Sequence, residues 1–275
     1  MEFTHLHTHS NYSLLQAVPK IPDLIKKAKG YGMKAIALTD NGNMYGTIEF
    51  YQECVKKEIK PIIGVDFYVA SRTRNDREGR LDAKTTRLIL LAKNYAGYMN
   101  LIKLVTRSNL EGFYYRPRID TELIQEHNTD LICIIPFDMS EISNNLKIND
   151  FEVADNIYEN LKSAYGQDDV YYELLKQEDI AGSQELEEKI ITFCQRHGIQ
   201  MVASNNVLYI EPEDKKARLT MLSIQSNNPD RNITDDGDFS FISPERALEL
   251  FTSENPERDI IYKQALANTG LIADK

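Results

Sequence analysis

The 275-residue sequence contains no tryptophan, three cysteines and five histidines. The cysteines are far apart and odd in number, which argues against a disulfide framework or a zinc-finger spacing and is typical of a reducing cytoplasm. No apolar run approaches the roughly 20 residues that a membrane-spanning helix needs, and no basic segment followed by an apolar stretch opens the chain. We therefore predict a cytoplasmic protein with no membrane partner.

Negative charge outweighs positive charge. The chain has 32 lysines and arginines against 42 aspartates and glutamates, a net charge of −10. Proteins whose main task is to grip nucleic acid are usually basic, because neutralising phosphates dominates that affinity. Any contact with DNA should therefore be local. The sequence also lacks a nucleophile elbow, a phosphate-binding loop and a dinucleotide-binding glycine pattern.

Seven apolar, β-rich runs alternate with segments of helical periodicity. Several runs, such as AIALT and LICIIP, are almost continuously apolar, which is typical of parallel strands covered on both faces. Parallel strands joined by helices predict a βα barrel, in which chemistry gathers at the carboxyl ends of the strands. The predicted strands are Phe3–His7, Ala35–Thr39, Pro61–Ala70, Arg87–Ala92, Leu131–Pro136, Val170–Leu174 and Met201–Ser204.

Helical periodicity covers residues 21–32, 45–57, 95–109, 151–166 and 183–198. After about residue 210 the strand signal fades, and we expect helices in IEPEDKKARLTMLSIQ and SPERALELF, joined by the polar stretch SNNPDRNITDDGD. These helices predict an extension that packs on the barrel or leads into a further part of a longer chain.

Histidine and carboxylate side chains concentrate at the predicted strand ends. His5, His7 and His9 alternate within HLHTH, so an extended chain would aim all three imidazoles at one spot. Asp66 lies on the third predicted strand, and Asp40, Asn41 and Asn206 follow others. Imidazole with carboxylate suits zinc, manganese and iron, and a bound metal activates water for attack on phosphate.

Five stretches carry a resemblance to a known family: HLHTHSNYSLL, AIALTDNGNMYGTIEFY, KPIIGVDFYVA, LEGFYYRPRID and VASNNVLYI. They resemble the N-terminal PHP (polymerase and histidinol phosphatase) domain of bacterial DNA polymerase III alpha subunits. The resemblance implies a distorted seven-stranded (βα)7 TIM-like barrel. Residues 1–275 would form a single PHP domain, with a barrel core over about 1–210 and a helical extension over about 211–275 leading toward the polymerase body.

The resemblance also implies a metal centre that this chain has lost. Intact relatives hold two or three metal ions with nine ligands. Here several of those places carry neutral amides, a permanently cationic arginine, or apolar side chains that cannot ligate. Only His7, His9 and Asp66 remain as ligands, with His5 beside them in a supporting place. The nine corresponding positions are His7, His9, Gln16, Asn41, Asp66, Arg87, Phe137, Asn206 and Leu208.

This pattern predicts no catalytic residue and no cofactor in the chain. The implied role is structural: packing against the remaining domains of the polymerase chain and docking a proofreading exonuclease. The parent polymerase would use Mg²⁺ to extend primer–template DNA. Three alternatives stay open: weak binding of one Zn²⁺ or Mn²⁺ ion at the three retained ligands; a metal-dependent phosphoesterase or 3′–5′ exonuclease; and an interaction module outside replication.

Three expectations concern cationic residues. We expect Arg87 to pair with Asp66 or Asp40, in place of a lost cation. Ser71–Arg87, with six basic and three acidic residues, predicts an exposed loop or hairpin. LEGFYYRPRID combines groups that stack on bases and pair with phosphates, although its tyrosines could equally sit at a barrel rim with the arginines pairing nearby acids. The candidates for DNA or inter-domain contact are Tyr114, Tyr115, Arg116 and Arg118.

Overall fold

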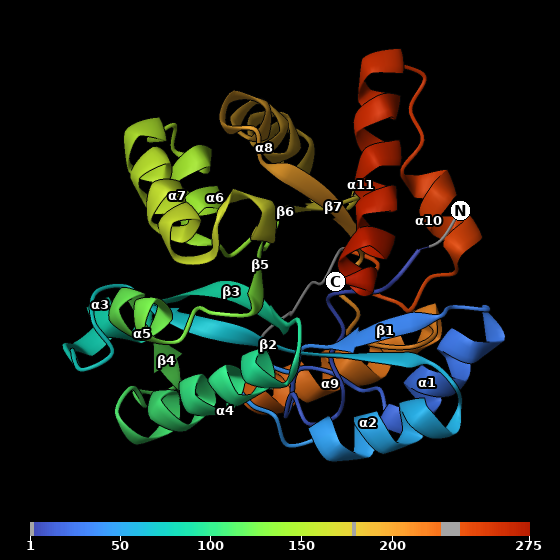
Figure 1. The fold of residues 1–275 in the computed structure, drawn as a ribbon, viewed down its shortest axis with the longest axis horizontal. Coiled ribbons are helices and arrows are strands. Elements are labelled where there is room, and N and C mark those ends of the chain that lie inside the picture. Colours follow the sequence, from blue (N-terminus) through green and yellow to red (C-terminus); the bar gives the residue numbers. More distant parts are fainter. Residues whose placement is uncertain (1–2, 178–179, 227–236) are drawn as a thin grey trace.

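A computed structural model describes residues 3–177, 180–226 and 237–275. One curled sheet forms the centre, in the strand order β1-β2-β3-β5-β6-β7, with β4 beside β2 (Figure 1). The strands are β1 Ala35–Leu38, β2 Lys60–Ala70, β3 Thr85–Ala92, β4 Arg118–Ile119, β5 Leu131–Ile135, β6 Val170–Leu175 and β7 Gln200–Ser204. Six of the seven predicted strands are thus confirmed, and the two-residue β4 was not predicted.

Helices cover the outer face of the sheet. The predicted helical segments are confirmed as α1 Ile21–Gly30, α2 Thr47–Lys56, α4 Tyr95–Leu110, α7 Phe151–Tyr165 and α8 Ser183–His197. Asn94 shows why one of them starts where it does, because its side chain accepts hydrogen bonds from the first free N–H groups of α4. Shorter helices are α3 Gly79–Ala83, α5 Thr121–Glu126 and α6 Glu141–Lys147.

The first segment of the chain closes the barrel, but it is not the predicted strand. The backbone around residues 5–9 lies between β1 and β7, where Ala37 N–H donates to His5 O (2.8 Å) and Val207 N–H donates to His7 O (2.9 Å). Only Thr8 forms a strand-like bridge, to Val207. The prediction of a strand at Phe3–His7 was therefore wrong, because the segment shares its hydrogen bonds between two neighbours and builds a continuous ladder with neither.

The sheet is not purely parallel, as the continuous apolar runs had suggested. β3 runs antiparallel to both β2 and β5. The reason is the connection: β2 and β3 are joined by the loop Ser71–Lys84 with α3, a hairpin and not a helical crossover. The expected hairpin is thus confirmed and is mostly exposed, although Arg74 and Asp82 are buried and residues 85–87 belong to β3. The architecture is a distorted barrel. One consequence is that the beginning of β3 lies at the same mouth as the ends of the parallel strands.

Side chains alternate between two apolar layers. Leu6, Ala37, Ile89, Ile134 and Tyr171 belong to the inner cluster within the barrel. Their neighbours along the strands, such as Cys133 and Tyr172, belong to the larger cluster between sheet and helices. This alternation decides which strand residues can face the mouth of the barrel. Among the helices of the described residues, none has the length and apolar character needed to cross a bilayer.

The C-terminal helices are η2 Pro212–Asp214, α9 Lys215–Ser226, α10 Pro244–Leu250 and α11 Pro256–Asp274, and the 3-10 turn η1 Gln167–Asp169 precedes β6. α11 packs along β7, and Asn268 donates to Met201 O (2.7 Å) (Figure 1). Glu187 on α8 accepts from Arg258 on α11 (3.0 Å) and also from Lys176, which follows β6 (3.0 Å). Of the predicted polar linker over residues 226–238, residues 227–236 lie outside the described residues.

Candidate functional site

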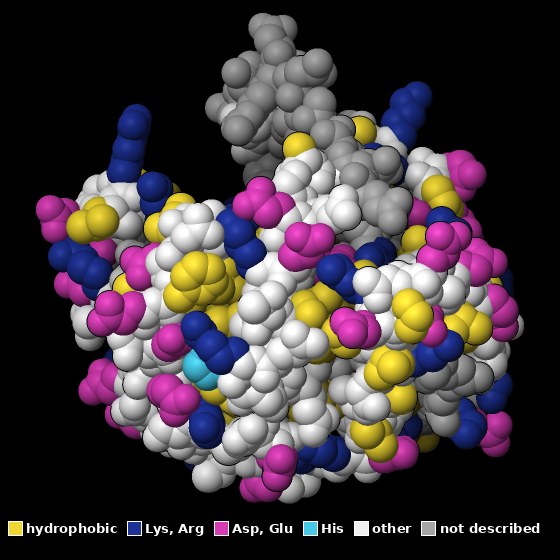
Figure 2. All heavy atoms as spheres, turned by 90° about the horizontal axis from the view of Figure 1, so that it is seen from above, with side chains coloured by type: hydrophobic (Ala, Val, Ile, Leu, Met, Phe, Trp, Pro, Cys, Tyr) yellow, Lys and Arg dark blue, Asp and Glu magenta, His cyan; other side chains and the backbone are white. Residues whose placement is uncertain are grey.

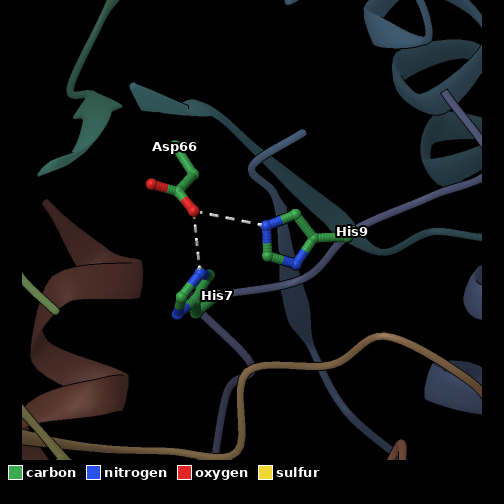
Figure 3. A group of neighbouring side chains, drawn as sticks. All are labelled: His7, His9 and Asp66. Atoms are coloured by element: carbon green, nitrogen blue, oxygen red, sulfur yellow. Dashed lines mark hydrogen bonds and ion pairs between the residues drawn. The ribbon is translucent and has the colours of Figure 1, made fainter. Parts of the chain in front are cut away.

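Two of the three N-terminal histidines meet a carboxylate at the mouth of the barrel (Figure 3). His7 Nε2 lies 3.4 Å and His9 Nε2 3.5 Å from Asp66 Oδ2, and all three residues are buried. The candidate ligand atoms lie within 4.8 Å of one another. These three residues form a group that could hold a metal ion, since zinc accepts imidazole nitrogen and carboxylate oxygen.

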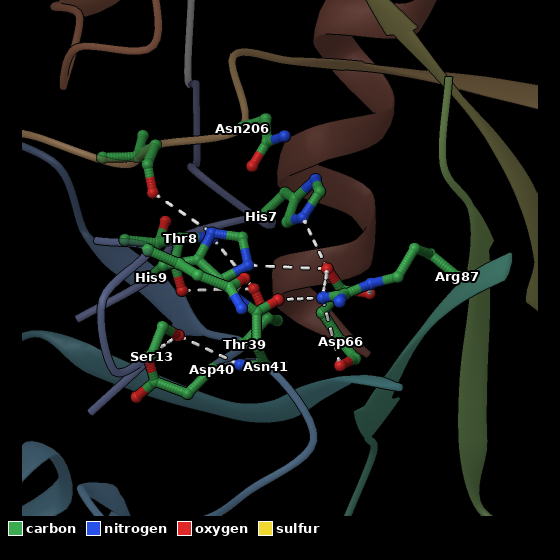
Figure 4. Close-up of polar contacts among 12 residues, drawn as sticks. His7, Thr8, His9, Ser13, Thr39, Asp40, Asn41, Asp66, Arg87 and Asn206 are labelled. Carbon is green, nitrogen blue, oxygen red and sulfur yellow. Dashed lines mark hydrogen bonds and ion pairs between the residues drawn. The ribbon is translucent and has the colours of Figure 1, made fainter. Parts of the chain in front are cut away.

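The guanidinium of Arg87 is paired with the carboxylate of Asp66 (Figure 4). Arg87 Nε donates to Asp66 Oδ1 at 3.0 Å, and a terminal nitrogen of Arg87 donates to Asp66 Oδ2 and to Asn41 Oδ1. Both charged side chains are buried. The expected pairing of Arg87 is thus confirmed for Asp66. It rests on the antiparallel register of β3, which sets Arg87 opposite Tyr68, two residues along β2 from Asp66.

The pair controls the ionisation of Asp66. Burial alone would raise the pKa of its carboxyl group, but the positive charge of Arg87 and the hydrogen bond from His7 lower it far below its ordinary value. Arg87 also lies over the Tyr68 ring, with its guanidinium carbon 4.0 Å from the ring centroid. Asp66 is therefore a carboxylate whose charge is balanced by the chain itself.

A second buried carboxylate, which the sequence interpretation missed, belongs to the site. Glu173 on β6 accepts from His7 Nδ1 at 2.7 Å and from the backbone N–H of Phe137 at 3.0 Å. Burial lowers the pKa of His7, but Glu173 and Asp66 outweigh it and raise the pKa to about 9. With His7 as an imidazolium, the two cations His7 and Arg87 match the two carboxylates.

His9 has one nitrogen satisfied and one not. Its Nδ1 donates to Val207 O at 3.2 Å, while Nε2 is buried without a hydrogen-bond partner among the described residues. Burial, together with the nearby charge of His7, lowers the pKa of His9. Asn206 Oδ1 is likewise buried and has no hydrogen-bond partner within the described residues. Two polar atoms with spare capacity therefore face the site.

The nine positions that the resemblance had marked come together in space. All of them line one cavity of ≈ 790 Å³ at the barrel mouth, including the residues farthest apart in sequence. Gln16 accepts from Asn41 Nδ2 at 2.7 Å and donates to Tyr68 Oη at 3.2 Å. Phe137 and Leu208 contribute apolar walls. The sequence thus located the cavity correctly, although it did not predict Glu173.

Other expectations were wrong. His5 does not point to the same spot as His7 and His9: its Nε2 lies 3.0 Å from Ile242 O and its ring packs on Phe241. The chain bends at His7, directly before the bridge residue Thr8, and this bend breaks the regular alternation that the prediction assumed. Asp40 does not pair with Arg87, because its carboxylate accepts from Ser10 and from Ser13 Oγ (2.6 Å). These hydrogen bonds hold the turn at residues 10–13 in place.

Among the candidates for DNA contact, Arg118 is a buried structural residue and not a surface residue. Its guanidinium donates to the backbone carbonyls of Gly112 and Asp82, each at 2.9 Å. Tyr115 is exposed, whereas Tyr114 and Arg116 are half-buried. These last three residues stay candidates for contact with a partner.

Comparison with known proteins shows which family this chain belongs to. The family model for the PHP domain matches residues 5–177. The chain belongs to the PHP domain family. This PHP domain is 38% identical over 278 residues to DNA polymerase III subunit alpha of Borreliella burgdorferi, covering 99% of the chain and 23% of that relative. The same subunit of Aquifex aeolicus is 31% identical, covering 100% of this chain and 24% of that relative. The same subunit of Thermus aquaticus is 36% identical, covering 82% of this chain and 19% of that relative.

This PHP domain therefore spans about a quarter or less of the length of the curated relatives it matches. Solved structures also resemble it. An amidohydrolase from Chromobacterium violaceum has a TM-score of 0.47 at 14% identity, covering 73% of this chain and 86% of that one. A two-domain protein from Bacteroides vulgatus, containing a predicted PHP-like metal-dependent phosphoesterase, has a TM-score of 0.46 at 12% identity, covering 75% and 52%.

Proposed function

We propose that this chain is the PHP domain of a DNA polymerase III alpha subunit, and that the domain is structural and carries no catalytic metal centre. The observation that supports this most strongly is the buried pair of Arg87 and Asp66 at the point where His7 and His9 converge. A fixed guanidinium supplies the positive charge that a metal ion would otherwise bring, and it repels a divalent cation at close range.

The donor set argues in the same direction. A bridged centre needs carboxylates shared between ions, and the cavity offers amides at Gln16, Asn41 and Asn206 with apolar side chains at Phe137 and Leu208. Glu173 is engaged by His7 and by the backbone of Phe137. These residues do not fit a cluster of two or three metal ions, so we derive no hydrolytic step for this domain.

The domain would serve the polymerase chain as a scaffold in the cytoplasm. Its partners would be the remaining domains of that chain and a proofreading exonuclease. The parent polymerase would bind primer–template DNA and use its own Mg²⁺ ions to add nucleotides. The identity to polymerase subunits over almost the whole chain supports this placement. Pull-down with purified replication proteins tests it: we expect retention of a polymerase fragment or an exonuclease, and retention of neither would contradict it.

A second candidate rests on the unsatisfied nitrogen of His9. One Zn²⁺ or Mn²⁺ ion held weakly by His7, His9 and Asp66 would satisfy His9 Nε2 and leave an open position. That arrangement would favour the alternative of a phosphoesterase or 3′–5′ exonuclease. Metal analysis of protein purified without chelator, with a nuclease assay in manganese, separates the two: stoichiometric metal and activity abolished by His9→Ala would support the second candidate.

A further inference from the structure

Two loops on the side of the barrel form one surface whose residues, apart from Arg116, do not line the cavity. They are the loop between β2 and β3 and the loop between α4 and β4. Arg118 joins them, since its guanidinium donates to carbonyls of Arg74 and Asp82 in one loop and of Gly112 in the other. We call this the Tyr115 surface; its residues are Arg77, Arg80, Lys84, Phe113, Tyr115 and Arg116.

Aromatic side chains stand out from this surface. Tyr115 is 71% and Phe113 53% exposed. The backbone of Tyr115 has φ 59°, in the left-handed region that bulky residues rarely adopt. Tyr114 supports it from below, with ring centroids 4.6 Å apart, and Tyr114 Oη is fixed to Gly79 O at 3.4 Å. The loop therefore holds an exposed ring in a costly conformation, a pattern that clusters at functional sites.

The two loops contain more basic side chains than their acidic side chains pair with. Asp82 accepts from Arg72, and Glu111 accepts from Arg74 and Arg107. By contrast, four cations make no ion pair within the described parts of the chain. They are Arg77, Arg80, Lys84 and Arg116.

This excess of positive charge is local. Residues 71–87 and 111–118 together carry eight basic and four acidic side chains, in a chain whose net charge is −10. Figure 2 shows dark blue lysine and arginine side chains at its left edge, the edge at which α3 lies in Figure 1, with magenta acidic side chains among them. Arg116 connects this surface to the cavity, because it lines the cavity wall and lies 5.4 Å from the Tyr68 ring centroid.

We propose that the Tyr115 surface binds single-stranded nucleic acid. The unpaired cations would contact phosphates, and the exposed rings of Tyr115 and Phe113 would stack on bases, which only an unpaired strand presents on their faces. A protein partner is the less favoured occupant, because so many unpaired cations would need an equal number of acids opposite them. The inference rests on the proposed placement in a DNA polymerase chain, where single strands are at hand.

Fluorescence anisotropy with a labelled oligothymidine of about 20 nucleotides tests this proposal on the 275-residue chain at low salt. We expect saturable binding that weakens steeply with salt. Tyr115→Gly should weaken it about fivefold or more, since glycine removes the ring and suits the left-handed backbone. Tyr115→Phe should retain it. The combined change Arg80→Ala, Lys84→Ala and Arg116→Ala should weaken it at least about tenfold and flatten the salt dependence.

Matched controls lie elsewhere on the chain. Tyr95 is 76% exposed at the far end of α4, and Lys26 on α1 is an exposed cation without an ion pair among the described residues. Tyr95→Ala and Lys26→Ala should leave binding unchanged. The proposal fails if wild type does not bind, if the controls weaken binding as much as the Tyr115-surface variants, or if duplex DNA binds more tightly than the single strand. Such a failure would leave the pull-down test of the polymerase placement unaffected.

Discussion

Arg87 is the residue on which this account of the cavity depends. Taking a guanidinium and a carboxylate out of water is expensive, and the pair repays that cost only when each has its partner. In this domain Arg87 also meets the Tyr68 ring, and Asp66 also meets two imidazoles. Arg87, Asp66, His7 and Glu173 thus form a closed set of opposite charges. Such a set is stable as long as no member is removed.

Replacing Arg87 by alanine should lower the free energy of unfolding by about 3 kcal/mol or more, because it leaves Asp66 buried and unbalanced. Chemical denaturation measures this. The double variant Arg87→Ala, Asp66→Asn should lose less than the sum of the single losses. Arg246→Ala, which removes a half-exposed pair with Glu249, is the control and should cost less than about 0.5 kcal/mol. A similarly small cost for Arg87→Ala would contradict the closed set.

His5 makes the domain sensitive to acid. Burial lowers the pKa of His5 to about 4, while the hydrogen bond to Ile242 O opposes that shift. The unfolded chain binds this proton from its ordinary pKa of 6.5 downward and the folded chain does not, so this contribution to stability falls as the pH drops from 6.5 toward 4.

His5→Gln removes the titration and keeps a donor for the carbonyl. Between pH 7 and pH 5, the stability of the variant relative to wild type should therefore improve by about 2 kcal/mol. Denaturation curves at the two pH values measure the difference. Parallel pH profiles for the two proteins would show that His5 is not the acid-sensitive group.

At the residue scale, the sequence predicted which residues line the cavity better than it predicted the contacts between them. Residue types at the strand ends indicated only part of the site, and the full set of nine positions came from the resemblance to the PHP family. The strand ends had indicated His7, His9, Asn41, Asp66 and Asn206. Glu173 was overlooked, although the signal existed: it is a carboxylate at an inward position of the apolar strand β6, in step with Tyr171. The path of His5 could not be predicted, because it depends on Phe241 and Ile242, more than 200 residues away in the sequence.

At the scale of elements, apolar runs predicted where strands lie but not how they pair. The runs at Ala35 and Leu131 became β1 and β5 almost to the residue. The antiparallel direction of β3 did not follow from its composition, because a strand buried on both faces reads alike in either direction. β4 was missed because two residues carry no periodicity.

The packing of α4 gives a prediction about one glycine. A Cβ atom on Gly97 would lie 2.1 Å from Asp130 O, so the helix approaches the turn before β5 closer than any side chain allows. Gly97→Ala should destabilise the domain by about 2 kcal/mol or more, although alanine favours helix by up to about 1 kcal/mol. Thermal denaturation measures the loss.

Gly30 is the matched control for that change. It also lies in a helix, at the end of α1, but a Cβ atom there would meet nothing within 4 Å. Gly30→Ala should therefore be neutral or stabilise the domain by up to about 1 kcal/mol. Equal losses for the two substitutions would show that close packing of α4 is not the cause.

At the scale of the whole molecule, the domain is a barrel closed by its own N-terminal segment and braced by α11. Thr4 N–H donates to Thr269 Oγ1 at 3.1 Å, so the closing segment and the bracing helix hold each other. The same N-terminal segment carries His7 and His9, which line the cavity. Backbone hydrogen bonds and one buried set of charges therefore hold the N-terminal segment at residues 5–9 to the rest of the barrel.

The central claim is that Arg87 and His7 take the place of the metal ions, and thermal unfolding with and without added metal tests it most directly. Protein stripped of metal with EDTA, and then freed of the chelator, is heated in buffer alone and in about 100 μM Zn²⁺ or Mn²⁺. A metal that binds the folded domain at a hundred times its dissociation constant would add about 2.7 kcal/mol of stability. We predict a change in Tm of less than about 1 °C. A rise of about 5 °C or more that disappears in His9→Ala would contradict the account.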